Sequence, residues 1–450
     1  MIISSADFGK GFQWGVSTAA YQIEGAYQKD GKGPSIWDQF TSVKGNIQSG
    51  HHANNACDFY HRFEQDIDLM RYMGIKNFRL SLAWTRIFPE GRGRVNRKGV
   101  EFYHRLFDYC LEMGIEPWVT LYHWDLPYAL ELKGGWTNRD IIYWFQDYIA
   151  FCIKQFGDKV KHWMIMNEPM VFVGAGYFLG VHAPGKKGLG NFLPAVHHAT
   201  LAQAAGAEAV RAIASHAEIG TTFSCSYIEP YSHRMKDVNA AIKVDALLNR
   251  LFIEPTLGLG YPLKELKALN KIEKYVKAGD ESNMKVDFDF IGIQNYTREI
   301  VKFAPMVPLI RAKLVKARNR GVKTTLMGWE VFPPGIYKML KKFDAYSDIK
   351  KIIVTENGAA FNDTLSMNKV IDESRVNYLK DHIAQVLRAK KDGVKVEGYF
   401  VWTFLDNFEW AEGYHPRFGL VYVDFQTQQR IVKSSGLWYK NFLGHNGLAN

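Results

Sequence analysis

The sequence predicts an α/β fold, a single (β/α)8 barrel of the TIM type, and three observations lead to this prediction. Short apolar runs, rich in β-branched and aromatic residues, recur eight times along the 450-residue chain. Segments with helical spacing of apolar residues separate these runs, which is typical of a parallel sheet covered by helices. No Gly/Ser linker or Pro-rich tract divides the chain, so we expect residues 1–450 to form one barrel domain.

The predicted strands are apolar runs that end in polar residues. In chain order they are FQWGVSTA from Phe12, NFRLSLAW from Asn77, EPWVTLYHW from Glu116, HWMIMNEP from His162, IGTTFSCS from Ile219, FDFIGIQNY from Phe288, KIIVTENG from Lys351 and VEGYFVWTF from Val396. Eight such strands close most economically into a barrel. An open doubly wound sheet is the alternative, but it would normally carry GxGxxG after its first strand, where this chain has GVSTAAYQIEG.

Amphipathic helices are expected between the strands. Residues 57–73 carry apolar side chains at helical spacing, and Gly74 marks the end of that helix. Asn138 is expected to cap a helix over 141–156. The other helices are expected at 100–113, 193–215, 238–251, 334–343 and 374–391.

Composition restricts the partners that the protein could have. Hydrophobic residues make up 47% and charged residues 23% of the chain, values that allow a large buried core. The formal net charge of +10 leaves nucleic acid or an anionic surface open as a partner. That excess is dilute over 450 residues, and no nucleic-acid-binding motif concentrates it. We therefore expect no nucleic-acid partner.

Cysteine usage and the N-terminus indicate the compartment. The chain has 4 cysteines and no CxxC pair, so we expect buried free thiols in a reducing environment. The N-terminus has neither a basic n-region nor an apolar h-region. The longest uncharged apolar stretch, 170–181, is shorter than the roughly 20 residues that span a bilayer. We expect a cytoplasmic protein with no membrane partner, and a homo-oligomer stays open.

Polar residues at the carboxyl ends of the predicted strands mark the expected active site. They are Arg79, His123, Trp124, Asn167, Glu168, Tyr296, Glu356, Asn357 and Trp402. Glu168 and Glu356 are the carboxylates of this set. One such glutamate alone would be explained by a local ion pair, because a buried carboxylate is costly unless it is paired or hydrogen-bonded. Two of them in one barrel favour a chemical role.

Two facing carboxyl groups among Trp, Tyr, His and Asn side chains match the needs of glycosidic cleavage. One protonates the leaving oxygen, and the other attacks or stabilises the anomeric carbon. Metal-dependent hydrolysis is the rival chemistry, but HExxH is missing and the adjacent pairs His51-His52 and His197-His198 lack ligand spacing. We interpret those histidines as solvated or capping residues and expect neither a metal nor another cofactor. A barrel that binds sugar without cleaving it is the second alternative.

The motifs around these residues resemble those of glycoside hydrolase family 1, the β-glucosidase family. The resemblance begins with FQWGVSTAAYQIEG at Phe12 and continues through FRLSLAWTRI, YHWDLP, NEP, MGWEV, VTENG and WTFLDNFEWAEGY, over about residues 8–443. It implies a (β/α)8 barrel and a retaining β-glycosidase without a cofactor. The implied substrate is a small β-glycoside or an oligosaccharide, from which a terminal non-reducing β-D-glucosyl residue is released.

The resemblance also implies roles for individual residues. Glu168 corresponds to the general acid/base and Glu356 to the nucleophile, while Arg79 and Tyr296 match the residues that hold the nucleophile. The matches to residues that contact the sugar or the leaving group are Gln22, His123, Trp124, Asn167, Tyr296, Trp329, Trp402, Glu409, Trp410 and Phe418. A cation and a hydroxyl beside Glu356 should keep it ionised, and that charge should raise the pKa of Glu168.

Departures from related branches narrow the expected substrate. The phospho-sugar branch would place Ser, Lys and Tyr where this chain has Glu409, Pro416 and Phe418. An anionic Glu409 should repel a phosphate, and Glu168 is intact where the plant thioglucosidase branch has Gln. A neutral β-D-glucoside is therefore favoured, with galactoside and fucoside activity tolerated.

Two features do not follow the family pattern. Ile165 stands where the family often has Thr. The segment before Trp329 carries the cations Arg311, Lys313, Lys316, Arg318, Arg320 and Lys323. We consider two interpretations of this basic segment, a solvated helix face and a positive rim that attracts anionic aglycones or an anionic surface.

Overall fold

Eight parallel strands close into a barrel in the computed structural model, which describes residues 3–444 of the chain. In chain order they are β1 (Gln13–Ser17), β2 (Asn77–Ser81), β3 (Glu116–Tyr122), β4 (His162–Asn167), β5 (Glu218–Ser224), β7 (Phe290–Gln294), β10 (Ile352–Asn357) and β13 (Val396–Trp402). β1 pairs with β13 from Gln13↔Gly398 to Ser17↔Trp402, which closes the ring. The barrel prediction is confirmed, and the open-sheet alternative is wrong.

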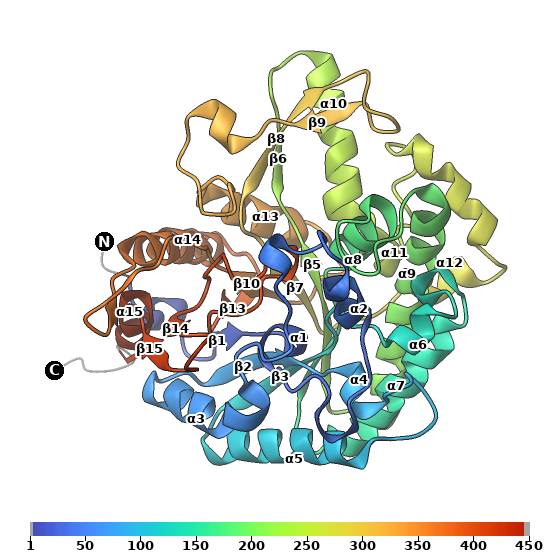
Figure 1. Cartoon of the computed structure of the whole chain (residues 1–450). Coiled ribbons are helices and arrows are strands. Elements are labelled where there is room, and N and C mark those ends of the chain that lie inside the picture. Colours follow the sequence, from blue (N-terminus) through green and yellow to red (C-terminus); the bar gives the residue numbers. More distant parts are fainter. Residues whose placement is uncertain (1–2, 445–450) are drawn as a thin grey trace.

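Helices surround the barrel (Figure 1). The long ones are α3 (Phe59–Tyr72), α5 (Arg97–Glu112), α7 (Ile141–Phe156), α9 (Leu189–Ile213), α10 (Met235–Asp245), α13 (Pro334–Asp344), α14 (Glu373–Lys391) and α15 (Ser434–Gly444). Each predicted helix is present. The helix predicted over 238–251 corresponds to α10, which ends at Asp245 and continues as a π-helical turn, η6 (Ala246–Arg250). The N-cap of α7 is Asp140, so the prediction that Asn138 caps this helix is wrong; the Asn138 side-chain oxygen instead accepts the backbone N–H of Asp140 at 2.9 Å.

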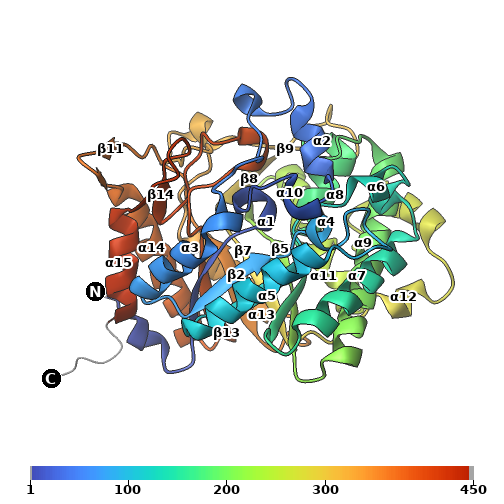
Figure 2. The ribbon, with the colours of Figure 1, turned by 60° about the horizontal axis from the view of Figure 1, so that its bottom comes forward.

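Short helices and strands lie in the connections between the barrel strands and the long helices. The short helices are α1 (Ala20–Ile23), α2 (Ile36–Ser42), α4 (Trp84–Ile87), α6 (Tyr128–Glu131), α8 (Pro169–Val173), α11 (Ile253–Thr256) and α12 (Asp280–Asn283). The short strands are β6 (Tyr227–Pro230), β8 (Arg298–Phe303), β9 (Ala312–Leu314), β11 (Leu365–Ser366), β12 (Lys369–Val370), β14 (Val421–Val423) and β15 (Arg430–Val432). In Figure 2, α2, α8, β8 and β9, which follow strand ends in the chain, lie in the upper half of the molecule.

An apolar layer fills the barrel interior. Its members come from different strands and are Trp118, Met164, Phe290, Ile353 and Phe400. Glycines make room for two of these rings, since a Cβ at Gly15 would lie 2.5 Å from the Phe400 ring and one at Gly220 would lie 2.3 Å from Phe290. Such close contacts cannot be relieved in a packed core. The layer is therefore a solid floor, and Arg79 Nε contacts Met164 Sδ at 3.3 Å.

His197 and His198 lie within α9 and are buried, so their interpretation as solvated or capping residues is wrong. His197 Nε2 lies 2.9 Å from Asp280 Oδ2, and His198 Nδ1 lies 3.0 Å from the Trp136 carbonyl oxygen. Both are satisfied by segments distant in sequence, because α12 and the 3-10 turn η4 (Gly135–Thr137) pack against α9. The cysteines are buried and unpaired, as expected. Among residues 3–444, no helix is long and apolar enough to cross a membrane.

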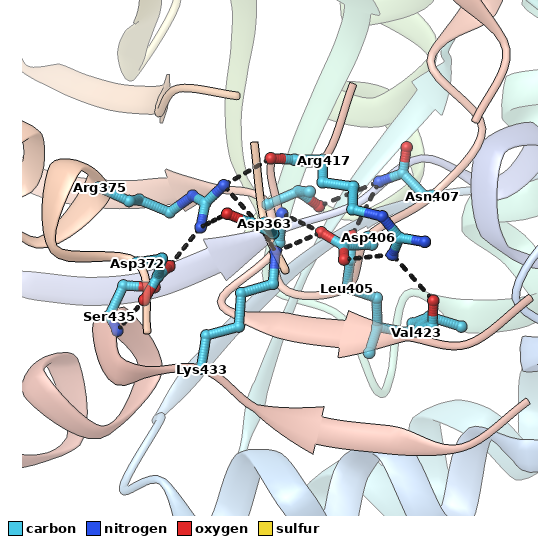
Figure 3. Close-up of polar contacts among 12 residues, drawn as sticks. Asp363, Asp372, Arg375, Leu405, Asp406, Asn407, Arg417, Val423, Lys433 and Ser435 are labelled. Carbon is cyan, nitrogen blue, oxygen red and sulfur yellow. Dashed lines mark hydrogen bonds and ion pairs between the residues drawn. The ribbon is translucent and has the colours of Figure 1, made fainter. Parts of the chain in front are cut away.

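A buried ionic network connects the segments that follow β10 and β13 (Figure 3). The cations Arg375, Arg417 and Lys433 contact the carboxylates Asp363, Asp372 and Asp406. Lys433 is fully buried; its Nζ contacts Asp363 and lies 2.6 Å from Asp406 Oδ1. Burial lowers the pKa of Lys433, and the two carboxylates oppose this shift. The network holds the segment that leads through Asn407 to Glu409.

We expect Lys433→Met to lower the free energy of unfolding by about 3–5 kcal/mol, because it leaves two buried carboxylates without their shared cation. The change would be measured as a lower urea midpoint or melting temperature. Lys44→Met is the matched control, since Lys44 is exposed and should change either value little. Equal effects of the two substitutions would contradict a stabilising role for the network.

Candidate active site

A cavity of about 310 Å³ opens among the segments that follow the carboxyl ends of the barrel strands. Its lining includes His123, Trp124, Asn167, Glu168, Tyr296, Trp329, Glu356, Trp402, Glu409, Trp410 and Phe418. All of these were predicted from the sequence. Two further predicted residues, Gln22 and Arg79, are fully buried behind the lining and contact residues of the cavity.

Glu356 near the end of β10 is held by three donors. Its Oε1 accepts from Arg79 Nη1 and, at 2.8 Å, from Gln294 Nε2. Its Oε2 accepts from the Tyr296 hydroxyl at 2.6 Å. Burial raises the pKa of Glu356 above its ordinary value, and the Arg79 cation and the Tyr296 hydroxyl offset this rise only in part. The structure thus brings both residues expected to hold Glu356 into contact with it, although Arg79 lies in the middle of β2 and not at its end.

Glu168 occupies the turn between β4 and α8. Its backbone has φ 48°, and its N–H donates to the Thr222 carbonyl oxygen at 3.0 Å. Pro169 then begins α8, as suits the first position of a helix. Burial, followed by the negative charge of Glu356, raises the pKa of Glu168 well above its ordinary value. Arg79 binds Glu356 directly, so Glu356 is the more acidic of the pair and Glu168 retains its proton longer.

Asn167, at the end of β4, forms hydrogen bonds with side chains of three other barrel strands, β2, β5 and β7. Its Oδ1 accepts from Arg79 Nη2 at 2.5 Å, from Gln294 Nε2 at 2.7 Å and from Thr222 Oγ1 at 2.9 Å. Its Nδ2 lies 2.9 Å from His123 Nε2. Sequence reasoning missed Gln294 and Thr222. Their position near the ends of β7 and β5 was the available signal, but only the closed ring shows which side chains point inward.

Buried polar atoms on two sides of the site lack protein partners. Within residues 3–444, His123 Nδ1 and Gln22 Oε1 have no hydrogen-bond partner. Burial lowers the pKa of His123 well below its ordinary value, so the ring is neutral. Gln22 Nε2 donates to the Phe408 carbonyl oxygen at 2.8 Å and lies 3.4 Å from Glu409 Oε2. Buried polar atoms of this kind suit a ligand rich in hydroxyl groups.

Aromatic rings form the remaining wall. The Tyr296 and Trp329 ring centroids are 5.4 Å apart, and those of Trp329 and Phe418 are 6.1 Å apart. Trp402 packs in the same cluster with Phe418. The ring centroids of Trp124 and Trp410 are 4.5 Å apart, and the Trp410 ring lies next to that of His123. The arrangement combines apolar faces with a few fixed polar groups, as small-molecule sites do.

The charged lining is acidic. In the part of the chain that the structure describes, the lining holds Glu168, Glu299, Glu356, Glu409 and Glu412 and no lysine or arginine.

The basic segment, residues 311–323, contains strand β9 and the 3-10 turn η8 (Ala317–Arg320) and no α-helix. Its interpretation as the face of a solvated helix is therefore wrong about the helix. Arg320 donates to Glu330 at 2.6 Å and is thereby occupied. Ile165 packs toward Gly206 of α9, away from the cavity.

Comparisons with known proteins agree with this geometry. The sequence model of glycosyl hydrolase family 1 matches residues 4–448. β-Glucosidase A of Thermotoga maritima is 45% identical over 443 residues, 98% of each chain. β-Glucosidase A of Acetivibrio thermocellus is 44% identical over 448 residues, 99% of this chain and 100% of its own. The solved structure of the Thermotoga maritima β-glucosidase in complex with deoxynojirimycin superposes with a TM-score of 0.94 at 44% identity, covering 98% of this chain and 99% of that one. The chain therefore belongs to glycosyl hydrolase family 1.

Proposed function

We propose that this protein is a retaining β-glucosidase that releases terminal non-reducing β-D-glucosyl residues from short oligosaccharides or from aryl and alkyl glucosides. One observation carries the proposal: two buried glutamates share a cavity in unlike surroundings. Glu356 contacts a guanidinium and a hydroxyl, whereas the pKa of Glu168 is raised by burial and by the charge of Glu356. That difference separates a nucleophile from an acid.

The first step uses both glutamates at once. Glu168 donates its proton to the glycosidic oxygen, the bond from C1 to that oxygen breaks, and the aglycone leaves as an alcohol. The Glu356 carboxylate attacks C1 and forms a covalent glycosyl ester with inverted configuration. Arg79 and Tyr296 hold the attacking carboxylate, because their hydrogen bonds fix both of its oxygens.

The second step follows from the change in charge. Once Glu356 is esterified, its negative charge no longer raises the pKa of Glu168, so the pKa of Glu168 falls. Glu168 gives up its proton in the first step and then acts as a base toward water. That water attacks C1, the ester bond breaks and Glu356 leaves as a carboxylate. A second inversion restores the β configuration, which is net retention.

The remaining predicted residues bind the substrate. We assign Trp402 to the sugar face, Phe418 to the C6 end and Trp329 to the side where the leaving group lies. Trp124 and Tyr296 are assigned to substrate binding without a side, and the residues assigned to the sugar hydroxyls are Gln22, His123, Asn167, Glu409 and Trp410. The unpartnered atoms of His123 and Gln22 support this assignment. No step requires a metal or another cofactor. We propose residues 1–450 as one catalytic domain, with cytoplasmic location supported by the unpaired thiols.

The lack of a lysine or arginine in the described cavity lining favours a neutral sugar. Burial raises the pKa of Glu409 to about 8, so this group is largely protonated at neutral pH. The repulsion expected from an anionic Glu409 is therefore reduced. The stronger reason is that position 416 holds proline, so no lysine stands there to pair with a phosphate at C6.

A panel of aryl β-glycosides with gluco, galacto, fuco and 6-phosphogluco sugars tests the function. We expect hydrolysis of the first three and a kcat/KM for the glucoside at least about a hundredfold above that of its 6-phosphate, because a buried phosphate without a cation is costly. Comparable values for the two would refute the neutral-sugar assignment. A site that binds glucose analogues yet hydrolyses none of the four would indicate a binding protein.

We expect Glu356→Gly to lose about a thousandfold or more in turnover, since the covalent nucleophile is removed. Azide should then restore reaction and yield the α-glycosyl azide, because the small anion attacks from the vacated face. Glu412→Gly is the matched control, an exposed glutamate of the same cavity that should lose less than about tenfold. A β-azide from Glu356→Gly would mean that the two glutamates have exchanged roles.

Glu168→Ala should separate substrates by their leaving groups. A dinitrophenyl glucoside needs little protonation, so we expect a burst of phenol followed by slow deglycosylation, while an alkyl glucoside loses nearly all rate. For the unmodified enzyme, kcat/KM on an alkyl glucoside should fall as pH rises through the raised pKa of Glu168, because the acid form is then lost. That basic limb should vanish from the burst rate of the variant. Equal losses for both substrates would exclude Glu168 as the acid.

A further inference from the structure

A second cavity lies apart from the active site. Its volume is about 650 Å³, roughly twice that of the active-site cavity. Its walls come from α8, the π-helical turn η5 (Gly174–Leu179), α9, α10, η6, the segment 264–269 and the segment 307–310 that joins β8 to β9. Figure 1 shows that α8, α9 and α10 lie on the same side of the barrel. The two cavities share no lining residue within residues 3–444.

The floor of this second cavity is apolar. Phe192 is buried there, and Phe178, Leu189 and Leu247 are half-buried. The polar side chains of the described lining are all charged, without a hydroxyl, amide, imidazole or indole group. A sugar would find few partners in such a cavity, whereas a hydrocarbon chain would leave water for apolar surface. The occupant should therefore carry an extended apolar chain.

The charged residues of this lining are Lys243, Lys264, Lys267 and Glu265. Glu265 Oε1 lies 3.4 Å from Arg250 Nη1, a cation that also binds Glu254, so Glu265 offsets at most one of the three lysine charges. Among residues 3–444, none of the three lysines forms an ion pair with a carboxylate, so the cavity has a net positive charge. Lysines can pack their methylene stems on apolar surface and keep the ammonium in water, where it can meet an anionic head group. The lining is thus complementary to a molecule with an apolar tail and one negative end.

We propose that this second cavity is a binding site for a single-chain anionic amphiphile, such as an alkyl carboxylate. The tail would lie against Phe192 and Leu247, and the carboxylate would lie among the lysines. The site adjoins the catalytic machinery through α8, which starts directly after Glu168. Met170 lines the second cavity, and the next residue, Val171, lines the active-site cavity. An occupant therefore contacts the helix that carries the turn of Glu168.

The test is calorimetric titration of the full-length protein with decanoate below its micellar concentration. We expect one molecule of decanoate bound per chain and weaker binding of decan-1-ol. Deoxynojirimycin, the ligand in the solved structure of the Thermotoga maritima relative, should not compete with decanoate. Leu247→Asp should weaken decanoate binding more than tenfold, because it places a negative charge on the apolar floor. Hydrolysis of a neutral aryl glucoside should be retained in this variant, which shows that it folds.

Matched charge variants decide whether the lysines act locally. Replacing Lys243, Lys264 and Lys267 with Gln should raise the Kd for decanoate about tenfold, as expected for the loss of several exposed charge contacts. Replacing Lys313, Lys316 and Lys323 with Gln removes the same net charge elsewhere and should leave the Kd within twofold. Equal weakening by both triple variants, competition by deoxynojirimycin, or no measurable binding of decanoate would each overturn the proposal. These outcomes are independent of whether the protein hydrolyses glucosides.

Discussion

The buried guanidinium of Arg79 is the group on which the arrangement of the active site depends. It has no access to solvent, so its charge must be met by protein acceptors. They come from two other strands: the Glu356 carboxylate of β10 and the Asn167 side-chain oxygen of β4. Gln294 of β7 joins the same two acceptors. These contacts can form together only when the sheet is closed into a ring, so fold and site are coupled.

The same cation separates the two carboxyl groups chemically. Both are buried, and burial alone would raise the pKa of each. Arg79 compensates Glu356 at close range, while Glu168 experiences the resulting negative charge. The apolar floor beneath Arg79 and the aromatic wall above it keep these interactions strong, because little water is present to screen them.

The loop that carries Glu409 and Trp410 depends on a different set of charges. Asp406 is bound by Lys433 and Arg417, and Asn407 accepts from Gln22 at 3.1 Å. Two neighbours in sequence thus connect the ionic network on one side to the sugar-binding side chains on the other. Pairing of this kind fixes loop geometry at an energetic cost that only full satisfaction of the buried charges offsets.

The sequence by itself determined the eight strands, the helices between them, and the residues expected at the site. The strands, the helices and the polar residues at the strand ends follow from local patterns, because apolar runs mark buried strands and their carboxyl ends lie at one rim of a barrel. The resemblance of the motifs to glycoside hydrolase family 1 added the other site residues, which are Gln22, Trp329, Glu409, Trp410 and Phe418. Tertiary structure alone decided the contacts of Gln294 and Thr222, the burial of His197 and His198, and the second cavity. The physical reason is that burial and pairing are set by segments far apart in the chain, so no local pattern encodes them. The raised pKa of Glu409 has the same origin, since it arises from desolvation by the folded surroundings.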